Sequence, residues 1–432
     1  MPVGTLLWVV LAAIAVSIAV SFKLKINLGI PALIFAYIIG CFILKMRVKE
    51  IVALWPTSTI FQLMTITMFF SFAVFNGTLP KVANKILYAS RNNVWALPII
   101  LLIVGVILGA LGAPPPAVNA ILAVICFTIA VPAGMNPFLM AIVVVYGGAA
   151  GTFFPWAVQG SIAKGVMSNY VGDLADSYTW KIFLGWLIFT VIYFVIVYIL
   201  TKGHKLKKPE IEKPEPFNEV QKKNLIVIII LAVLIIIPPL LKIFVPKSKT
   251  ISFLASALDI QMLAIVGVFV CTVMKLGDEK QAIVKGVPWS TIVMLGGICT
   301  LMGVASSAGV TDYIAQWIGS SMPVIAIAPI FTILGAFLSL FSGAINVVFP
   351  MLSAMAVPIA EVAGISPVPL FVGILVGASA TAISPFSTGG ATMIANCPDQ
   401  SLHEKLFNVC LAAAGIGAVI TVAMAFVGLF AL

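Results

Sequence analysis

Polar side chains that recur at matching points of otherwise apolar segments are the residues most able to bind a solute. Asn119 and Asn346 follow polar breaks, and Thr152 and Thr381 each stand just before a proline. A polar group inside an apolar segment is costly unless it is paired or binds something. Amides and hydroxyls donate to anions, and their oxygens coordinate hard cations such as Na⁺. The pattern therefore predicts a solute-binding site.

Two proline-containing breaks define the surroundings of these residues, at Pro155 and Pro385. Proline interrupts helical hydrogen bonding, so we interpret both positions as helix breaks. The segments just past these breaks, together with the polar tips of the hairpins that precede them, provide the candidate substrate ligands, which are Asn119, Asn346, Gln159, Ser387 and Thr388. The candidate cation ligands are Gly112, Asn119, Thr152, Ser342, Gly343, Asn346, Thr381 and Ser384. Purely structural roles stay open, with the asparagines capping their own helices and the glycines serving helix packing.

An internal repeat relates the two sets of candidates. At an offset of 232, residues 56–77 match residues 288–309 at eight positions, where about two would be expected by chance for this composition. With small gaps the register continues, so that Asn119 aligns with Asn346, Thr152 with Thr381, and Pro155 with Pro385. Both breaks therefore recur in both halves of the chain.

The elements that position these residues are apolar segments long enough to cross a bilayer, which takes about 20 residues. Uninterrupted segments run near 3–22, 27–44, 58–78, 94–112, 180–201, 224–241, 256–274, 289–308, 323–341 and 408–432. We predict that repeat 1 spans 1–201, with a hairpin at 94–132 and a broken helix at 138–166. Repeat 2 spans 224–432, with a hairpin at 323–360 and a broken helix at 368–397. Amphipathic surface segments precede the hairpins, at 80–92 and 311–320.

Composition sets the protein class. Hydrophobic residues make up 62% of the 432 residues and charged residues 9%, far from the balance of a soluble chain. The net charge of +10 is explained by basic loops rather than by nucleic-acid binding. The six cysteines and two histidines show no metal-type spacing, which predicts no transition-metal site and no cofactor. The fold class is an all-α polytopic membrane protein.

The topology follows from counting crossings. A hairpin returns to its own side, so each repeat crosses five times, and an odd number inverts one repeat relative to the other. If the linker 202–223 is cytoplasmic, 16 of the 24 Lys and Arg residues fall inside, as the positive-inside rule requires. Both termini then lie on the outer side of the membrane. We expect this membrane to be the inner or plasma membrane of the cell. Inverted repeats with broken helices are typical of secondary transporters, because freed backbone groups are tolerated where they line a site.

The layout resembles the ion transporter superfamily, in particular the divalent anion:sodium symporters and the malonate/dicarboxylate carriers. The resemblance is carried by the repeated P-x-S-T-I-x-x-L…G spans, the hairpin segments that contain Asn119 and Asn346, and the Thr/Pro breaks. It implies two inverted repeats that work by an elevator motion, often in a homodimer. Symporter members have Ser-Asn-Thr at each hairpin tip, and this chain matches only the asparagines.

The predicted function is Na⁺-coupled symport of a small organic anion, with a dicarboxylate implied by the resemblance. No acidic residue falls in a predicted span core, with Asp312 and Glu361 at the edges, which favours Na⁺ over H⁺ as the coupling ion. A proton-coupled carrier and a cation/proton antiporter stay open as alternatives. An enzyme is disfavoured because the spans lack paired Asp motifs and His/Glu metal sets. A passive channel is disfavoured by the paired broken helices.

Overall fold

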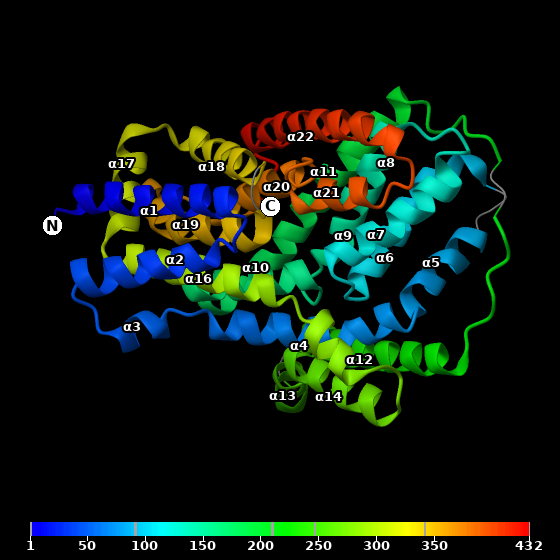
Figure 1. Ribbon diagram of the computed structural model, residues 1–432. Coiled ribbons are helices and arrows are strands. Elements are labelled where there is room, and N and C mark those ends of the chain that lie inside the picture. Colours follow the sequence, from blue (N-terminus) through cyan, green and yellow to red (C-terminus); the bar gives the residue numbers. More distant parts are fainter. Residues whose placement is uncertain (1, 90–92, 209–210, 246–247, 341–342, 432) are drawn as a thin grey trace.

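The computed structural model describes residues 2–89, 93–208, 211–245, 248–340 and 343–431, and in these ranges all regular structure is helical (Figure 1). The segments are too apolar to be stable as exposed helices, and long apolar runs without internal breakers favour continuous helices. Six helices are long and apolar enough to cross a membrane, and further apolar helices of 10–17 residues accompany them. This agrees with the predicted all-α polytopic membrane protein.

The first half of the chain contains helices on both sides of a hairpin. Its elements before the break are α1 (Val3–Leu24), α2 (Gly29–Tyr37), η1 (Ile38–Ile43), α3 (Val48–Ala53), α4 (Thr57–Phe75), α5 (Thr78–Ala89), η2 (Val94–Ala96), α6 (Leu97–Ala110), α7 (Pro115–Ile125), η3 (Cys126–Ala130), α8 (Pro137–Ile142), η4 (Val143–Gly147) and α9 (Gly148–Thr152). After the break come α10 (Val158–Val171), η5 (Gly172–Leu174) and α11 (Ala175–Leu200). Helices α6 and α7 form hairpin 1.

The second half follows the same order. Its elements are α12 (Glu219–Phe244), α13 (Lys249–Ala257), α14 (Ile260–Val273), α15 (Glu279–Gln281), η6 (Ala282–Gly286), α16 (Trp289–Ser307), α17 (Val310–Ser321), α18 (Val324–Ser339), η7 (Ala344–Val348), α19 (Phe349–Ala363), α20 (Val368–Thr381), α21 (Thr388–Ala395), η8 (Gln400–Leu402) and α22 (His403–Phe426). Helix α18 forms hairpin 2 with η7 and α19. Five of the η segments are π-helical, namely η1, η3, η4, η6 and η7.

Two pairs of helices keep the sequence offset of 232 residues. Helices α4 and α16 both contain 19 residues, and α5 and α17 both contain 12. Pro56 and Pro288 precede α4 and α16 with nearly the same backbone angles, φ −77° and ψ 67° against φ −83° and ψ 71°. Proline fixes φ and has no N–H to lose at a helix start, so it begins both helices at the same point. The inversion of the two halves across a membrane stays a prediction.

The two broken helices are bound directly to each other. The Tyr146 hydroxyl in η4 donates to the carbonyl of Ala380, one residue before the end of α20, at 2.5 Å. Tyr146 is fully buried and lies edge-on to Trp186 of α11. Helix α6 packs along α9, and α18 packs along α20, so each hairpin's first arm lies on the broken helix of its own half. A buried aromatic group therefore holds the two breaks in a fixed relation.

Packing also crosses between the halves. Helix α21, which follows the second break, packs against α7 of hairpin 1, and α10, which follows the first break, packs against η7 and α19 of hairpin 2. Figure 1 shows α10 between α16 and α9, near the centre of the structure. Each post-break helix is therefore positioned by the hairpin of the other half.

Charged side chains stay at the edges of this assembly. Within the described residues, no acidic or basic side chain is buried. Lys164 of α10 is partly buried and pairs with Asp176 at the start of α11 at 2.7 Å. The linker contacts α5 through Lys81, which lies 3.4 Å from Glu215. The spans are therefore lined by apolar and neutral polar groups.

Candidate solute-binding site

The first break lies between α9 and α10, and Pro155 is within it. Thr152 is the last residue of α9 and is fully buried. Its hydroxyl lies 2.7 Å from the Gln159 Oε1 atom across the break and 2.7 Å from the carbonyl of Ala149. Two predicted ligands, one for the cation and one for the substrate, are thus brought into direct contact.

The second break has the same outline, with Pro385 between α20 and α21. Thr381 ends α20, is fully buried, and donates to the carbonyl of Ala336 in α18 at 2.8 Å. The Ser384 hydroxyl donates to the carbonyl of Leu340 at 3.1 Å. The second break is therefore fastened to the first arm of hairpin 2 by two side-chain hydrogen bonds.

Each break is followed by a helix whose N-terminus has no side-chain cap. Ala157 is the N-cap residue of α10 and Ser387 that of α21, and neither side chain accepts a hydrogen bond from its helix. The first N–H groups of a helix have no partner within that helix and present a partial positive charge. The two uncapped N-termini are thus suited to bind carboxylate groups.

Three candidate substrate ligands contain a buried oxygen with no hydrogen-bond partner. These atoms are Asn119 Oδ1, Asn346 Oδ1 and Ser387 Oγ. A buried polar atom without a partner costs roughly 1–3 kcal/mol, so it persists where a ligand or water completes it. Asn119 lies in α7 and Asn346 in η7, on the second arms of the two hairpins.

The alternative that these asparagines cap their own helices is wrong. The N-cap residues are Pro114 for α7 and Gly343 for η7, and both asparagines lie inside the helical segments that follow. An asparagine within a helix points its amide sideways, toward the neighbouring element, rather than along its own N-terminus. Asn119 Oδ1 accordingly faces α9, and a Cβ added at Gly148 would lie 2.3 Å from it.

The packing of the post-break helices joins these residues into two groups. Because α21 packs against α7, Ser387 and Thr388 belong with Asn119, and because α10 packs against η7, Gln159 belongs with Asn346. Gly389 brings α21 close to the first broken helix, since its added Cβ would lie 2.9 Å from Val145 of η4. Each group combines an asparagine from one half with a helix N-terminus from the other.

Glycines at the starts of both post-break helices keep the breaks compact. A Cβ at Gly160 would lie 2.1 Å from the Phe154 carbonyl oxygen, and one at Gly390 would lie 2.2 Å from the Ile383 carbonyl oxygen. Real Cβ atoms do not approach a carbonyl this closely, so the backbone requires glycine at both positions. A break carbonyl therefore lies close to the first turn of each post-break helix, and that of Phe154 also accepts the N–H of Ala157 at 2.8 Å.

Three glycines at the hairpin tips and the first break differ in their surroundings. Gly112 turns the tip of hairpin 1 with φ +85°, a conformation that favours glycine, and it packs on the ring of Phe70. Gly151 packs on the carbonyl of Val106 in α6, which is a helix-packing contact. Gly343 has an ordinary φ of −79° and open surroundings. The predicted cation ligand Ser342 lies outside the described residues.

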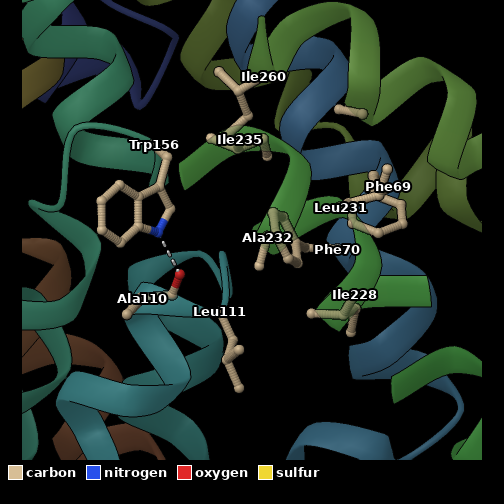
Figure 2. A pocket seen from close by; sticks show the side chains of 11 residues that line it. Phe69, Phe70, Ala110, Leu111, Trp156, Ile228, Leu231, Ala232, Ile235 and Ile260 are labelled. Carbon is tan, nitrogen blue, oxygen red and sulfur yellow. Dashed lines mark hydrogen bonds between the residues drawn. The ribbon is translucent and has the colours of Figure 1, made fainter. Parts of the chain in front are cut away.

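Two residues near the breaks escaped the sequence reasoning. Tyr146 joins the two broken helices, and the Trp156 indole N–H donates to the carbonyl of Ala110 at the end of α6 at 2.9 Å (Figure 2). The sequence does contain a signal for such residues, namely a Tyr or Trp close to a helix break. When buried, its single polar atom needs a hydrogen-bond partner, which a neighbouring segment can provide. Among the described residues, no cluster of His, Cys, Asp and Glu has the arrangement of a metal site.

An apolar cleft separates the first break from the helices beside it. Figure 2 shows Ala110, Leu111 and Trp156 on one side. The opposite side consists of residues from α4, α12 and α14, which are Phe69, Phe70, Ile228, Leu231, Ala232, Ile235, Ile260 and Ala264. The Trp156 to Ala110 bond lies within one side, and no hydrogen bond joins the residues that line the two sides. The first break and hairpin 1 thus meet these helices through smooth apolar contacts.

Comparison with known proteins agrees with this arrangement. Residues 5–152 match the family described as the N-terminus of the dicarboxylate carrier protein MatC. The structure is similar to that of the YdaH transporter of Alcanivorax borkumensis, with a TM-score of 0.57 and 15% identity over 88% of this chain and 87% of that one. It is also similar to MtrF of Neisseria gonorrhoeae, described in connection with a class of antimetabolite efflux pumps, with a TM-score of 0.56 and 14% identity over 89% and 83%.

No curated protein sequence is significantly similar to this chain. At 14–15% identity, the two structural neighbours establish the fold. The family match covers the segment that contains hairpin 1 and ends at Thr152, so it includes Gly112, Asn119 and Thr152. The resemblance to malonate and dicarboxylate carriers that the sequence predicted is confirmed over residues 5–152, and six helices of the described residues are long and apolar enough to cross a membrane.

Proposed function

We propose that this protein is a secondary active transporter that moves a small organic dianion, a dicarboxylate, together with Na⁺. The observation that carries the proposal is the pair of uncapped helix N-termini, at α10 and α21. Each of these helices packs against a hairpin segment, η7 or α7, that contains an asparagine with a buried, unpartnered oxygen. Two anion-binding ends within one site suit a substrate with two carboxylates. The family match to a dicarboxylate carrier supports the same substrate class.

Neutral ligands suit Na⁺ as the coupling ion. The backbone carbonyls at the breaks and the hydroxyls of Thr152, Thr381 and Ser384 are oxygen ligands of the kind that hard cations prefer. Asp312 and Glu361 are both exposed, and neither is placed as a buried proton carrier. Bound cations would offset the charge of the dianion in a site without Arg or Lys. Proton coupling is the alternative that the experiment below separates.

The apolar cleft supports alternating access by an elevator motion. Hairpin 1 and the first break meet α4, α12 and α14 through aliphatic and aromatic contacts with no cross-cleft hydrogen bond to break. Surfaces of this kind can slide at little cost, because apolar contacts are not directional. The hairpins and broken helices would move together, as the Tyr146 to Ala380 bond joins both breaks. We place the linker 202–223 in the cytoplasm and both termini outside, and we propose a homodimer.

Uptake into proteoliposomes tests the proposal. The purified protein is reconstituted, and uptake of labelled malonate, succinate and citrate is measured with an inward Na⁺ gradient and with choline in its place. Saturable uptake of one dicarboxylate that requires Na⁺ is expected. Uptake driven by a pH gradient and indifferent to Na⁺ would overturn the coupling ion, and no uptake of any dianion under either gradient would overturn the substrate class.

The assignment of the site is tested separately with Asn346→Ala. Loss of hydrogen bonding to a charged ligand is worth roughly 1.5–3 kcal/mol, so the substrate concentration for half-maximal uptake should rise at least about tenfold. Asn408→Ala on the exposed start of α22 is the matched control and should leave uptake unchanged. A folded Asn346→Ala protein with normal uptake would remove Asn346 from the site.

A further inference from the structure

A second cavity lies far from the helix breaks, at the foot of hairpin 1. Its volume is about 350 Å³, and its interior is formed mainly by apolar side chains, including Phe127, Val131, Met140 and Leu406. Three polar residues line it as well, namely Asn136, Thr201 and Lys405. The candidate substrate and cation ligands do not contribute to it. The cavity is therefore an amphipathic pocket with a role of its own.

The ends of several apolar helices place this cavity at one surface of the membrane. Helix α11 ends at Leu200, α8 begins at Pro137 and α22 begins at His403, and all three ends border the cavity. Figure 1 shows α8 beside the first turns of α22. Because apolar helices end where the hydrocarbon ends, the interior of the cavity faces acyl chains and its rim faces lipid headgroups.

Lysines lie at and next to the lining of the cavity. Lys405 lines the cavity, and Lys202 directly follows the lining residue Thr201. The backbone N–H of Lys207 donates to the carbonyl of Ala133 at 2.8 Å, which holds the linker against the hairpin foot beside the lining residue Gly134. All three side chains are exposed, and none forms an ion pair with a described acidic residue. Even Glu404, next to Lys405 in the chain, is not within ion-pair distance of it.

Asn136 adds a neutral donor to this rim. Its Oδ1 atom accepts the N–H of Phe138 at 2.8 Å and caps α8, which leaves the amide NH₂ group to donate outward. A phosphate at the rim would therefore meet three cationic groups and one amide donor. Behind it, the apolar walls would receive the first part of an acyl chain.

We propose that this cavity binds one anionic phospholipid, with its phosphate among Lys202, Lys207 and Lys405 and its acyl chain against Phe127 and Val131. Charge complementarity selects this occupant, because each Lys near an anionic membrane surface contributes favourably to binding and a zwitterionic lipid offers no net charge. A soluble anion would pair with the lysines but would leave the apolar walls of the cavity exposed to water. The lipid would reinforce the contact between the linker and the hairpin foot that the Lys207 to Ala133 bond already makes.

Thermal unfolding of the purified protein in detergent, titrated with short-chain lipids, tests this site without reference to uptake. Dioctanoyl phosphatidylglycerol is expected to raise Tm in a saturable manner, and dioctanoyl phosphatidylcholine at the same concentrations is not. The triple variant Lys202→Gln/Lys207→Gln/Lys405→Gln should bind phosphatidylglycerol at least about tenfold more weakly. Val131→Trp, which fills the cavity and keeps every charge, should also abolish the Tm rise.

The control Lys275→Gln/Lys280→Gln/Lys285→Gln removes the same charge from exposed positions away from the cavity. This control should bind phosphatidylglycerol like the wild type. If it loses as much affinity as the Lys202/Lys207/Lys405 variant, general surface charge explains the binding and the proposed site is wrong. A Tm rise with phosphatidylcholine equal to that with phosphatidylglycerol would overturn the headgroup contacts. A Tm rise produced equally by inorganic phosphate would overturn the lipid and leave a soluble anion as the occupant. Because the readout is Tm, failure here leaves the proposed transport function untouched.

Discussion

The two helix breaks have nearly the same backbone but different polar side chains. At positions related by an offset of 230, the first break has Ala157, Val158 and Gln159, and the second has Ser387, Thr388 and Gly389. The hydroxyl of Thr152 lies against Gln159 within its own break, whereas Thr381 and Ser384 donate to carbonyls of hairpin 2. The backbone frame and the buried threonine are thus duplicated, whereas the residues that follow the proline differ.

The hairpins differ in the same way. Hairpin 1 enters its second arm through Pro114, Pro115 and Pro116, which have no N–H groups to offer an anion. Hairpin 2 enters through Gly343 and Ala344, which do. The two ends of a bound dianion would therefore meet unequal surroundings, one rich in hydroxyls and one built from an amide and backbone N–H groups. The asymmetry shows that a repeated backbone can present different polar groups in its two halves.

The largest effects on uptake are expected from replacing the glycines that the backbone of both breaks requires. Gly160→Ala and Gly390→Ala each force a Cβ against a break carbonyl, which should cost about 1–3 kcal/mol of stability and displace the N-terminus of the following helix. We expect uptake to fall more than tenfold in both variants, measured in proteoliposomes alongside Tm. Gly415→Ala, where an added Cβ meets nothing within 4 Å, is the control and should behave as wild type. Normal uptake by either variant would show that its break does not form part of the site.

Exchanging the N-cap residues of α10 and α21 tests whether the two breaks differ in how their helix N-termini bind substrate. Ser387→Ala deletes a buried hydroxyl that has no partner, so the free energy of unfolding should stay the same or rise, while substrate affinity should fall about tenfold. Ala157→Ser supplies α10 with a cap, which should stabilise the fold by about 1 kcal/mol and weaken substrate binding by competing for the same N–H groups. Denaturant unfolding and uptake at varied substrate concentration measure the two quantities. A loss of stability in Ser387→Ala would mean that the hydroxyl serves the fold.

Much of this architecture follows from composition and periodicity. The all-helical fold, the hairpins and the positions of Pro155 and Pro385 can be read from apolar run lengths and from the internal repeat, because burial and the missing proline N–H act locally. The ends of helices and the short helices α3, α13 and α15 were not predicted, since these segments are too short or too polar to stand out from loops.

The relation between the two halves lies beyond such reasoning. The grouping of Asn119 with Ser387 and of Asn346 with Gln159 depends on which helix packs on which, and an unaligned sequence contains no such information. Tyr146 also lies in a π-helical segment, η4, where an additional residue per turn redirects the side chain toward Ala380. A regular helix projected from the sequence would have placed that hydroxyl elsewhere.

Replacing the two equivalent threonines should have moderate effects that differ between the breaks. The variant at the second break should mainly lower stability, and the variant at the first break should mainly change the Na⁺ dependence of uptake. Thr381→Val removes a hydrogen bond to Ala336 and should cost about 1 kcal/mol of stability. Thr152→Val releases the Gln159 side chain, which should change the Na⁺ concentration for half-maximal uptake by about threefold to tenfold and change Tm less. Identical effects of the two variants on both quantities would contradict the distinction between the breaks.

The smallest effect is expected at the contact that only the first break makes. Trp156→Phe deletes the hydrogen bond to the Ala110 carbonyl and retains the ring that packs against Phe154 and lines the apolar cleft. The loss of one neutral hydrogen bond should lower the free energy of unfolding by about 1 kcal/mol and leave substrate affinity within about twofold of wild type. Trp180→Phe, which keeps an aromatic ring at a partly exposed site beside Phe154, is the matched control and should change neither quantity appreciably. If Trp156→Phe instead alters the maximal uptake rate at unchanged affinity, the bond holds hairpin 1 to the first break during movement. The second break, fastened to its own hairpin by Thr381 and Ser384, would then be the more rigid of the two.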